Sequence, residues 1–188
     1  MSLQRGRWKE GLFPMRAAGT TYLLVGAILA TFVAMLTAIV IATPGAWQFG
    51  YRPQALIQPV VALVGLTALV WCLMVAWRNL AVIRGSVSLR YFRAYTSDAP
   101  AEWVERPTRT YMNLLEIPVL FYVACALMLV TGKFDSTQVA LAWVFVLIRC
   151  LHAFIHIGFN YVPLRFAAFL AGSLTLAVLW TRFAVQNL

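Results

Sequence analysis

Two long stretches of the chain contain no charged residue, and they constrain the fold more than any other feature. One lies between Arg16 and Arg52, and the other lies between Arg52 and Arg78. Each is longer than the ~20 apolar residues that a helix needs to cross a bilayer. The chain as a whole is 62% hydrophobic and 11% charged, whereas about 25% of the residues in soluble domains are charged. The sequence therefore predicts an all-α integral membrane protein whose surroundings are a lipid bilayer.

Five apolar spans are predicted, and they are Thr20–Thr43, Leu56–Trp77, Thr110–Thr131, Gln138–Phe159 and Pro163–Ala184. The last two form one apolar block. We divide it at Asn160 to Pro163 because proline lacks a backbone donor and suits the first turn of a helix. The first span is longer than the ~7–15 apolar residues of a signal peptide. We therefore expect a basic leader at 1–19 and a retained, extra transmembrane helix at 20–43.

The positive charges are distributed in short segments between the spans. The net charge is +9, but the cations do not form one basic face, so we expect no nucleic-acid partner. Lysine and arginine accumulate in cytoplasmic segments of membrane proteins. With the N-terminus inside, the inner segments hold Arg5, Arg7, Lys9, Arg16, Arg84, Arg90, Arg93, Arg106 and Arg165, and the outer ones hold Arg52, Lys133 and Arg182. This bias predicts a cytoplasmic N-terminus and a C-terminus on the opposite side.

The only sizeable segment that we expect outside the membrane runs from Arg78 to Arg109. It is too short to form a soluble domain of its own. Any functional site must therefore lie within or beside the bilayer.

Polar residues inside the third and fourth spans form two stripes. A charged side chain at the centre of a span costs about 2.5–3.5 kcal/mol, so its presence needs an explanation. Arg109, Asn113 and Glu116 are four and three residues apart, which places them on one helix face. A second stripe on the fourth span consists of Arg149, His152, His156 and Asn160. The helical rise puts Arg149 and Glu116 at similar depths, so the two stripes can face each other.

Three interpretations of the stripes remain open. Glu116 and Arg149 can form a structural ion pair between helices. His152 and His156, four residues apart, can bind a metal ion together with Glu116, although the chain has only two histidines and Arg149 shares their stripe; we therefore expect no metal. The third interpretation is a pocket for an anionic or zwitterionic ligand that enters from the cytoplasm. Arginine would bind its carboxylates and Glu116 an ammonium group.

Two runs of the sequence form recognisable motifs. The run from Glu105 to Glu116 has the pattern E-R-x-x-x-x-x-x-N-x-x-E, and Arg149-x-x-His152-x-x-x-His156 is followed by Pro163-x-Arg165. Both resemble motifs of the MAPEG family, the membrane-associated proteins of eicosanoid and glutathione metabolism. The likeness covers about Leu56 to Leu188, and the whole pattern resembles the bacterial branch. It implies a MAPEG-like four-helix bundle at 55–188 after the extra helix, in a bacterial inner membrane with a periplasmic C-terminus.

The resemblance also implies a function and a set of site residues. Family members form homotrimers that hold glutathione, as co-substrate, between protomers near the cytoplasmic side. The positions that match glutathione contacts of family members are Arg109, Asn113, Glu116, Arg149, His152 and Arg165, and we also expect His156 to bind glutathione. Arg165 is the catalytic candidate, since a nearby cation favours the thiolate over the thiol. A free thiol has a pKa of about 8.5. The expected activity is that of a glutathione-dependent transferase or peroxidase acting on a lipophilic small molecule.

Several positions depart from the family pattern. Met112 stands where a basic residue is common, and His156 stands where a tyrosine is common. Phe166 and Phe169 occupy places where several enzymes of the family present hydroxyl groups. A non-catalytic scaffold or lipid-binding member of the same fold is therefore one alternative. A transporter or channel subunit is a second, because intramembrane arginine and glutamate also mark permeation paths, although the spans show no broken-helix pair.

Overall fold

The structure is a computed structural model that describes residues 15–42, 52–88, 91 and 100–187. Most of the basic leader, with Arg5, Arg7 and Lys9, lies outside the described residues, as do Arg90 and Arg93. The orientation that we inferred from these cations therefore stays a prediction.

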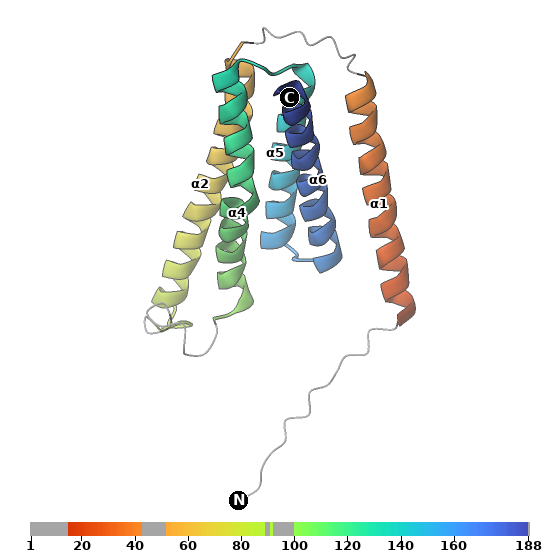
Figure 1. The fold of residues 1–188 in the computed structure, drawn as a ribbon. Coiled ribbons are helices and arrows are strands. Elements are labelled where there is room, and N and C mark those ends of the chain that lie inside the picture. Colours follow the sequence, from red (N-terminus) through yellow and green to blue (C-terminus); the bar gives the residue numbers. More distant parts are fainter. Residues whose placement is uncertain (1–14, 43–51, 89–90, 92–99, 188) are drawn as a thin grey trace, which may run out of the picture.

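Five α-helices make up most of the described chain. They are α1 (Met15–Ala42), α2 (Gln54–Ile83), α4 (Glu102–Thr131), α5 (Ser136–Ile157) and α6 (Val162–Asn187). The helices run side by side and alternate in direction (Figure 1). α5 packs against α6, α4 and α2, while α1 packs against α6. In the described part of the chain, α2, α4, α5 and α6 are long and apolar enough to cross a membrane. The prediction of a four-helix membrane bundle preceded by an extra helix is confirmed.

The connection between α2 and α4 is shorter than the sequence predicted. α2 continues beyond Trp77 to Ile83, and α4 begins at Glu102 rather than at Thr110. Glu102 and Glu105 lie in the first turn of α4, where negative charge interacts favourably with the helix dipole. Hydropathy located only the apolar part of each helix, because charged first turns do not register as membrane-spanning. Arg106 consequently belongs to a helix and not to a connection, and Arg109 lies on the same helix as Asn113 and Glu116, as their spacing predicted.

The predicted break between the last two spans is present as a tight turn. Gly158 follows α5, and a Cβ atom there would lie 2.9 Å from the carbonyl oxygen of Phe154. Asn160 has a φ of 49°, in the left-handed region that asparagine tolerates better than most residues. Its backbone N–H donates to the Ile155 oxygen at 2.8 Å. The turn therefore closes the end of α5 and sets α6 directly beside it.

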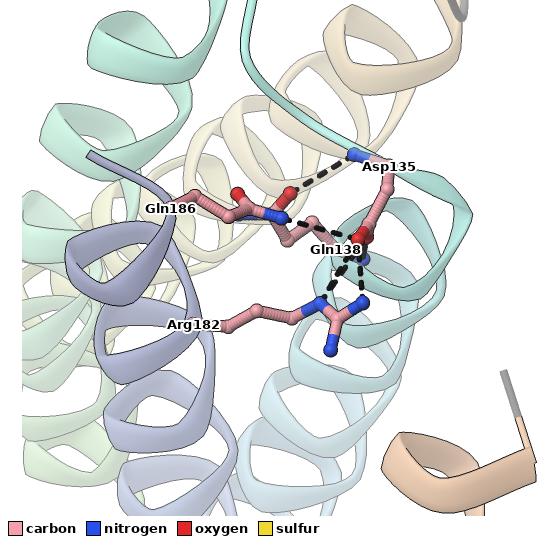
Figure 2. A network of polar contacts seen from close by, with 4 residues as sticks. All are labelled: Asp135, Gln138, Arg182 and Gln186. Atoms are coloured by element: carbon pink, nitrogen blue, oxygen red, sulfur yellow. Dashed lines mark hydrogen bonds and ion pairs between the residues drawn. The ribbon is translucent and has the colours of Figure 1, made fainter. Parts of the chain in front are cut away.

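At the other end of the same two helices, Asp135 forms a buried polar network (Figure 2). Its carboxylate accepts from the backbone N–H of Gln138 at 3.0 Å, and the Gln138 side chain accepts from the Asp135 N–H at 2.9 Å. Arg182 of α6 donates through Nη2 at 2.6 Å and through Nε at 3.0 Å, and Gln186 donates at 3.1 Å. This network caps α5 and ties its first residues to the end of α6.

The core between these two ends is apolar. Phe121 of α4 stacks on Phe145 of α5 with 4.8 Å between ring centroids, and both side chains are fully buried. Between membrane-spanning helices such rings stabilise the fold through van der Waals packing, because lipid tails are as apolar as the core. The packing fixes the rotation of α4 and α5 about their axes, and with it the direction of the polar stripes.

Candidate ligand-binding site

A cavity of about 470 Å³ opens between α4, α5 and α6 near the α5–α6 turn. Its size falls within the roughly 300–1,000 Å³ that small-molecule pockets occupy. Its lining contains every residue of the predicted site except Arg149: Arg109, Asn113, Glu116, His152, His156 and Arg165. The apolar part of the lining is Met112, Val162, Phe166 and Phe169. Residues far apart in sequence thus meet because three helices converge at one end of the bundle.

The α4 side of the cavity carries both signs of charge. Arg109 and Glu116 are exposed, and Asn113 donates through Nδ2 to the Arg109 carbonyl at 2.9 Å. Among the described residues, the ion pairs are Arg106 with Glu102 and Arg182 with Asp135. Neither pair uses Arg109 or Glu116, so both charges remain available to a ligand.

The α5 side of the cavity is formed by the two histidines. His152 is 4% exposed and His156 is 3% exposed, and their ring centroids lie 5.7 Å apart in an edge-to-face arrangement. Nδ1 of His156 is buried and has no hydrogen-bond partner among the described residues. Buried polar atoms normally find a partner, so this nitrogen is a candidate contact for a bound molecule.

Arg149 lies behind the cavity wall. It is 1% exposed, and its guanidinium carbon is 5.0 Å from the ring centroid of Phe145 and 5.6 Å from that of Phe169. Nε and Nη2 have no hydrogen-bond partner in the part of the chain that the structure describes. Phe169 contacts this guanidinium and also lines the cavity, so the arginine does not reach Glu116.

The histidines and Glu116 line the same cavity, but they do not form a metal-ligand cluster. Across residues 15–42, 52–88, 91 and 100–187, no group of three or more His, Cys, Asp and Glu side chains could hold a metal ion. The structure thus adds no support to the metal interpretation, and Glu116 forms no ion pair with Arg149 either.

Comparison with known proteins identifies the family. The MAPEG family model matches residues 56–185, which run from the first turn of α2 almost to the end of α6. The chain belongs to the MAPEG family. α1 lies outside the matched range, so the extra helix is an addition to the MAPEG unit. No curated protein and no solved structure matches the chain.

In this MAPEG protein, the positions that depart from the family pattern also line the cavity. Met112 contributes to the α4 side, and Phe166 and Phe169 contribute to the α6 side. The ring of Phe169 lies 6.2 Å from that of His152. The cavity thus combines charged groups on α4 with an apolar surface on α6.

Sequence reasoning missed a polar network at the rim of the MAPEG cavity. Asn160, predicted as part of the α5 stripe, lies in the turn after α5. It accepts from Nη1 of Arg165 at 2.7 Å and donates to Oε1 of Glu102 at 2.7 Å. Arg106 contacts Glu102 at 3.2 Å and donates to the Gly158 carbonyl at 2.6 Å. The sequence placed Glu102 in the connection before the third span, which gave no reason to expect a contact with the turn. In the structure α4 already begins at Glu102, and this position brings its side chain to Asn160.

Proposed function

We propose that this MAPEG protein binds glutathione and uses it as a co-substrate in a transferase or peroxidase reaction on a lipophilic electrophile. The observation that carries the proposal is the convergence of Arg109, Asn113, Glu116, His152 and Arg165 on one cavity. The residues come from three helices and two separate motifs. Membership of the MAPEG family supports the same conclusion.

The charges of the cavity are complementary to those of glutathione. The tripeptide carries two carboxylates, one ammonium group and a thiol. Arg109 and Arg165 offer forked donors for anionic groups, and Glu116 offers a carboxylate for the ammonium group. Arg149 lies one layer deeper and adds positive potential behind Phe169. A zwitterionic ligand with a net negative charge would pair with both the arginines and the carboxylate of the cavity.

Arg165 is the candidate for stabilising the thiolate. It lies in the first turn of α6, where the positive end of the helix dipole adds to its charge. In a transferase reaction, the sulfur lone pair forms the bond to an electrophilic carbon, and the leaving group departs with its bonding electrons. The exposed apolar side chain of Phe166 beside the cavity provides a surface for a lipophilic substrate that arrives from the bilayer.

The open side of the cavity supports the homotrimer that the family resemblance implies. Arg109 and Glu116 are exposed in the single chain although α4 is long and apolar enough to span the membrane. Charged side chains that face lipid are costly, and they usually face the interior of a helical assembly. A neighbouring protomer would cover them and complete the site. We further propose that the cavity lies on the cytoplasmic side of a bacterial inner membrane, with the C-terminus in the periplasm.

A second candidate function is that of a binding protein without catalytic activity. Phe166 and Phe169 line the cavity where a hydroxyl group is expected in family enzymes. Such a protein would bind glutathione or a lipid in the same cavity and leave the electrophile unchanged.

The proposal is tested by titration calorimetry of the detergent-solubilised protein with glutathione. Glu116→Gln and Arg109→Leu each remove a charge-assisted contact worth about 1.5–3 kcal/mol. We expect each variant to bind roughly 10- to 100-fold more weakly. Arg52→Leu is the matched control, because Arg52 is an exposed cation outside the cavity, and it should bind like the wild type.

Two further assays distinguish the candidates. Chlorodinitrobenzene reports C–S bond formation with loss of chloride, and a lipid hydroperoxide reports peroxidase activity. Turnover of either by the wild-type protein supports the enzyme. Binding of glutathione without turnover of either compound supports the binding protein. If glutathione does not bind, both the glutathione-dependent enzyme and the glutathione-binding protein are contradicted.

A further inference from the structure

We propose that Asn160 is a positioning residue, which fixes the direction of the Arg165 guanidinium at the cavity rim by bridging it to Glu102. The inference rests on the proposed function, since Arg165 is the residue that we assign to the thiolate. It is carried by contacts between the α5–α6 turn and the first two turns of α4.

The bridge consists of two short hydrogen bonds made by one side chain. Nη1 of Arg165 donates to Oδ1 of Asn160 at 2.7 Å, and Nδ2 of Asn160 donates to Oε1 of Glu102 at 2.7 Å. An asparagine amide has an acceptor at one atom and donors at the other. Asn160 can therefore join a cation to a carboxylate, and it does so across two helices.

Glu102 is itself held in place, so the bridge has a fixed support. Its Oε2 lies 3.2 Å from Nη2 of Arg106, one turn further along α4. Nη1 of Arg106 donates to the carbonyl of Gly158 at 2.6 Å. Since Gly158 belongs to the same turn as Asn160, the contacts form a closed ring. Hydrogen bonds with a charged partner are shorter and stronger than neutral ones, which favours a single arrangement of the ring.

The backbone at Asn160 shows that the turn alone does not explain this residue. Its φ of 49° is most easily adopted by glycine, and among other residues by asparagine and aspartate. Glycine would satisfy the turn but would provide no bridge. Aspartate would accept from Arg165 but would offer no donor to Glu102. Asparagine meets both the backbone requirement and the requirement for a donor and an acceptor.

The consequence for the site is a pre-oriented cation. An arginine side chain has many rotamers, and ordering it when a ligand binds reduces affinity. Asn160 is the hydrogen-bond partner of the Arg165 guanidinium among the described residues. The bridge uses Nη1 and leaves the other guanidinium donors for the ligand, so the cation is aimed before glutathione arrives.

The first test follows the ultraviolet absorbance of the bound thiolate as a function of pH in full-length, detergent-solubilised protein. Asn160→Gly keeps the backbone conformation and removes the bridge, while Glu102→Gln weakens its support. We expect Asn160→Gly to bind glutathione with a titration midpoint about one pH unit higher, which is ~10-fold less thiolate below the midpoint. Glu102→Gln should shift the midpoint less, because glutamine still offers an acceptor to Asn160 and the loss of a negative charge favours the thiolate. Glu105→Gln is the control, since Glu105 contacts Tyr91 at 3.5 Å and should keep the wild-type midpoint.

The second test needs no glutathione. A double-mutant cycle measures thermal unfolding for Glu102→Gln and Arg165→Met, two residues with no ion pair between them among those described. We expect non-additive shifts that become additive in an Asn160→Gly background. Additive shifts in the wild-type background, or unchanged thiolate midpoints in both variants, overturn the inference. If the wild type does not bind glutathione, the proposed function fails and the cycle alone decides whether the bridge exists.

Discussion

The two ends of the helical bundle carry charged groups in opposite arrangements. At one end, Asp135 is 3% exposed, and its carboxylate receives hydrogen bonds from Arg182, Gln186 and the backbone of Gln138 (Figure 2). At the cavity end, Arg109 and Glu116 are exposed and do not pair with each other or with another described residue.

The difference separates a structural role from a binding role. A buried charge is tolerated when it has a partner and hydrogen bonds, and the Asp135 network meets that condition within one chain. Arg109 and Glu116 have no such partner among the described residues, so their interaction energy is left for something outside the chain, either a ligand or a second protomer.

Asp135→Leu should destabilise the protein without weakening ligand binding. Loss of one partner of a buried ion pair costs about 3–5 kcal/mol, and loss of the N-cap adds about 1 kcal/mol. We expect a large fall in the thermal unfolding midpoint in detergent, and partial recovery in the double variant with Arg182→Leu. Lys133→Ala, a change at an exposed cation nearby, should have little effect. An Asp135→Leu protein as stable as the wild type would contradict the structural role.

Arg149→Met should have the reverse effect. The guanidinium is buried, and two of its nitrogens have no hydrogen-bond partner among the described residues. Replacing a buried ion pair by apolar side chains of similar size is often neutral or stabilising by about 1–4 kcal/mol, and a buried charge without a partner is costlier still. We expect a higher unfolding midpoint together with weaker glutathione binding by calorimetry, as is common when a site carries a destabilising group. A lower midpoint with unchanged affinity would make Arg149 a structural residue.

Tyr161→Phe should have the smallest effect. The Tyr161 hydroxyl donates to Oγ1 of Thr21 at 3.2 Å and so joins α1 to the turn beside the cavity. The bond is exposed, and such a bond contributes about 0.5–1.5 kcal/mol. We expect a small fall in the unfolding midpoint, and no further fall when the change is made in a Thr21→Val background. Additive losses would show that α1 is not attached at this point.

The helical spans and their polar stripes could be predicted because each depends on short-range periodicity. Arg109, Asn113 and Glu116 share a face by spacing alone, and the charge-free stretches exceed the thickness of a bilayer. The break before Pro163 was also local, since it followed from the missing donor of proline. The two family motifs added the expectation of glutathione, which stays a proposal.

The tertiary structure decided which polar residues meet. Arg149 belongs to the same stripe as His152, yet packing against Phe145 and Phe169 buries it behind the cavity. Glu102 and Asn160 lie 58 residues apart and form a hydrogen bond only because α4 begins earlier than its hydropathy suggests. Spacing along one helix fixes the direction of a side chain, but the packing of neighbouring helices fixes its partners, and that packing depends on the shapes of distant side chains.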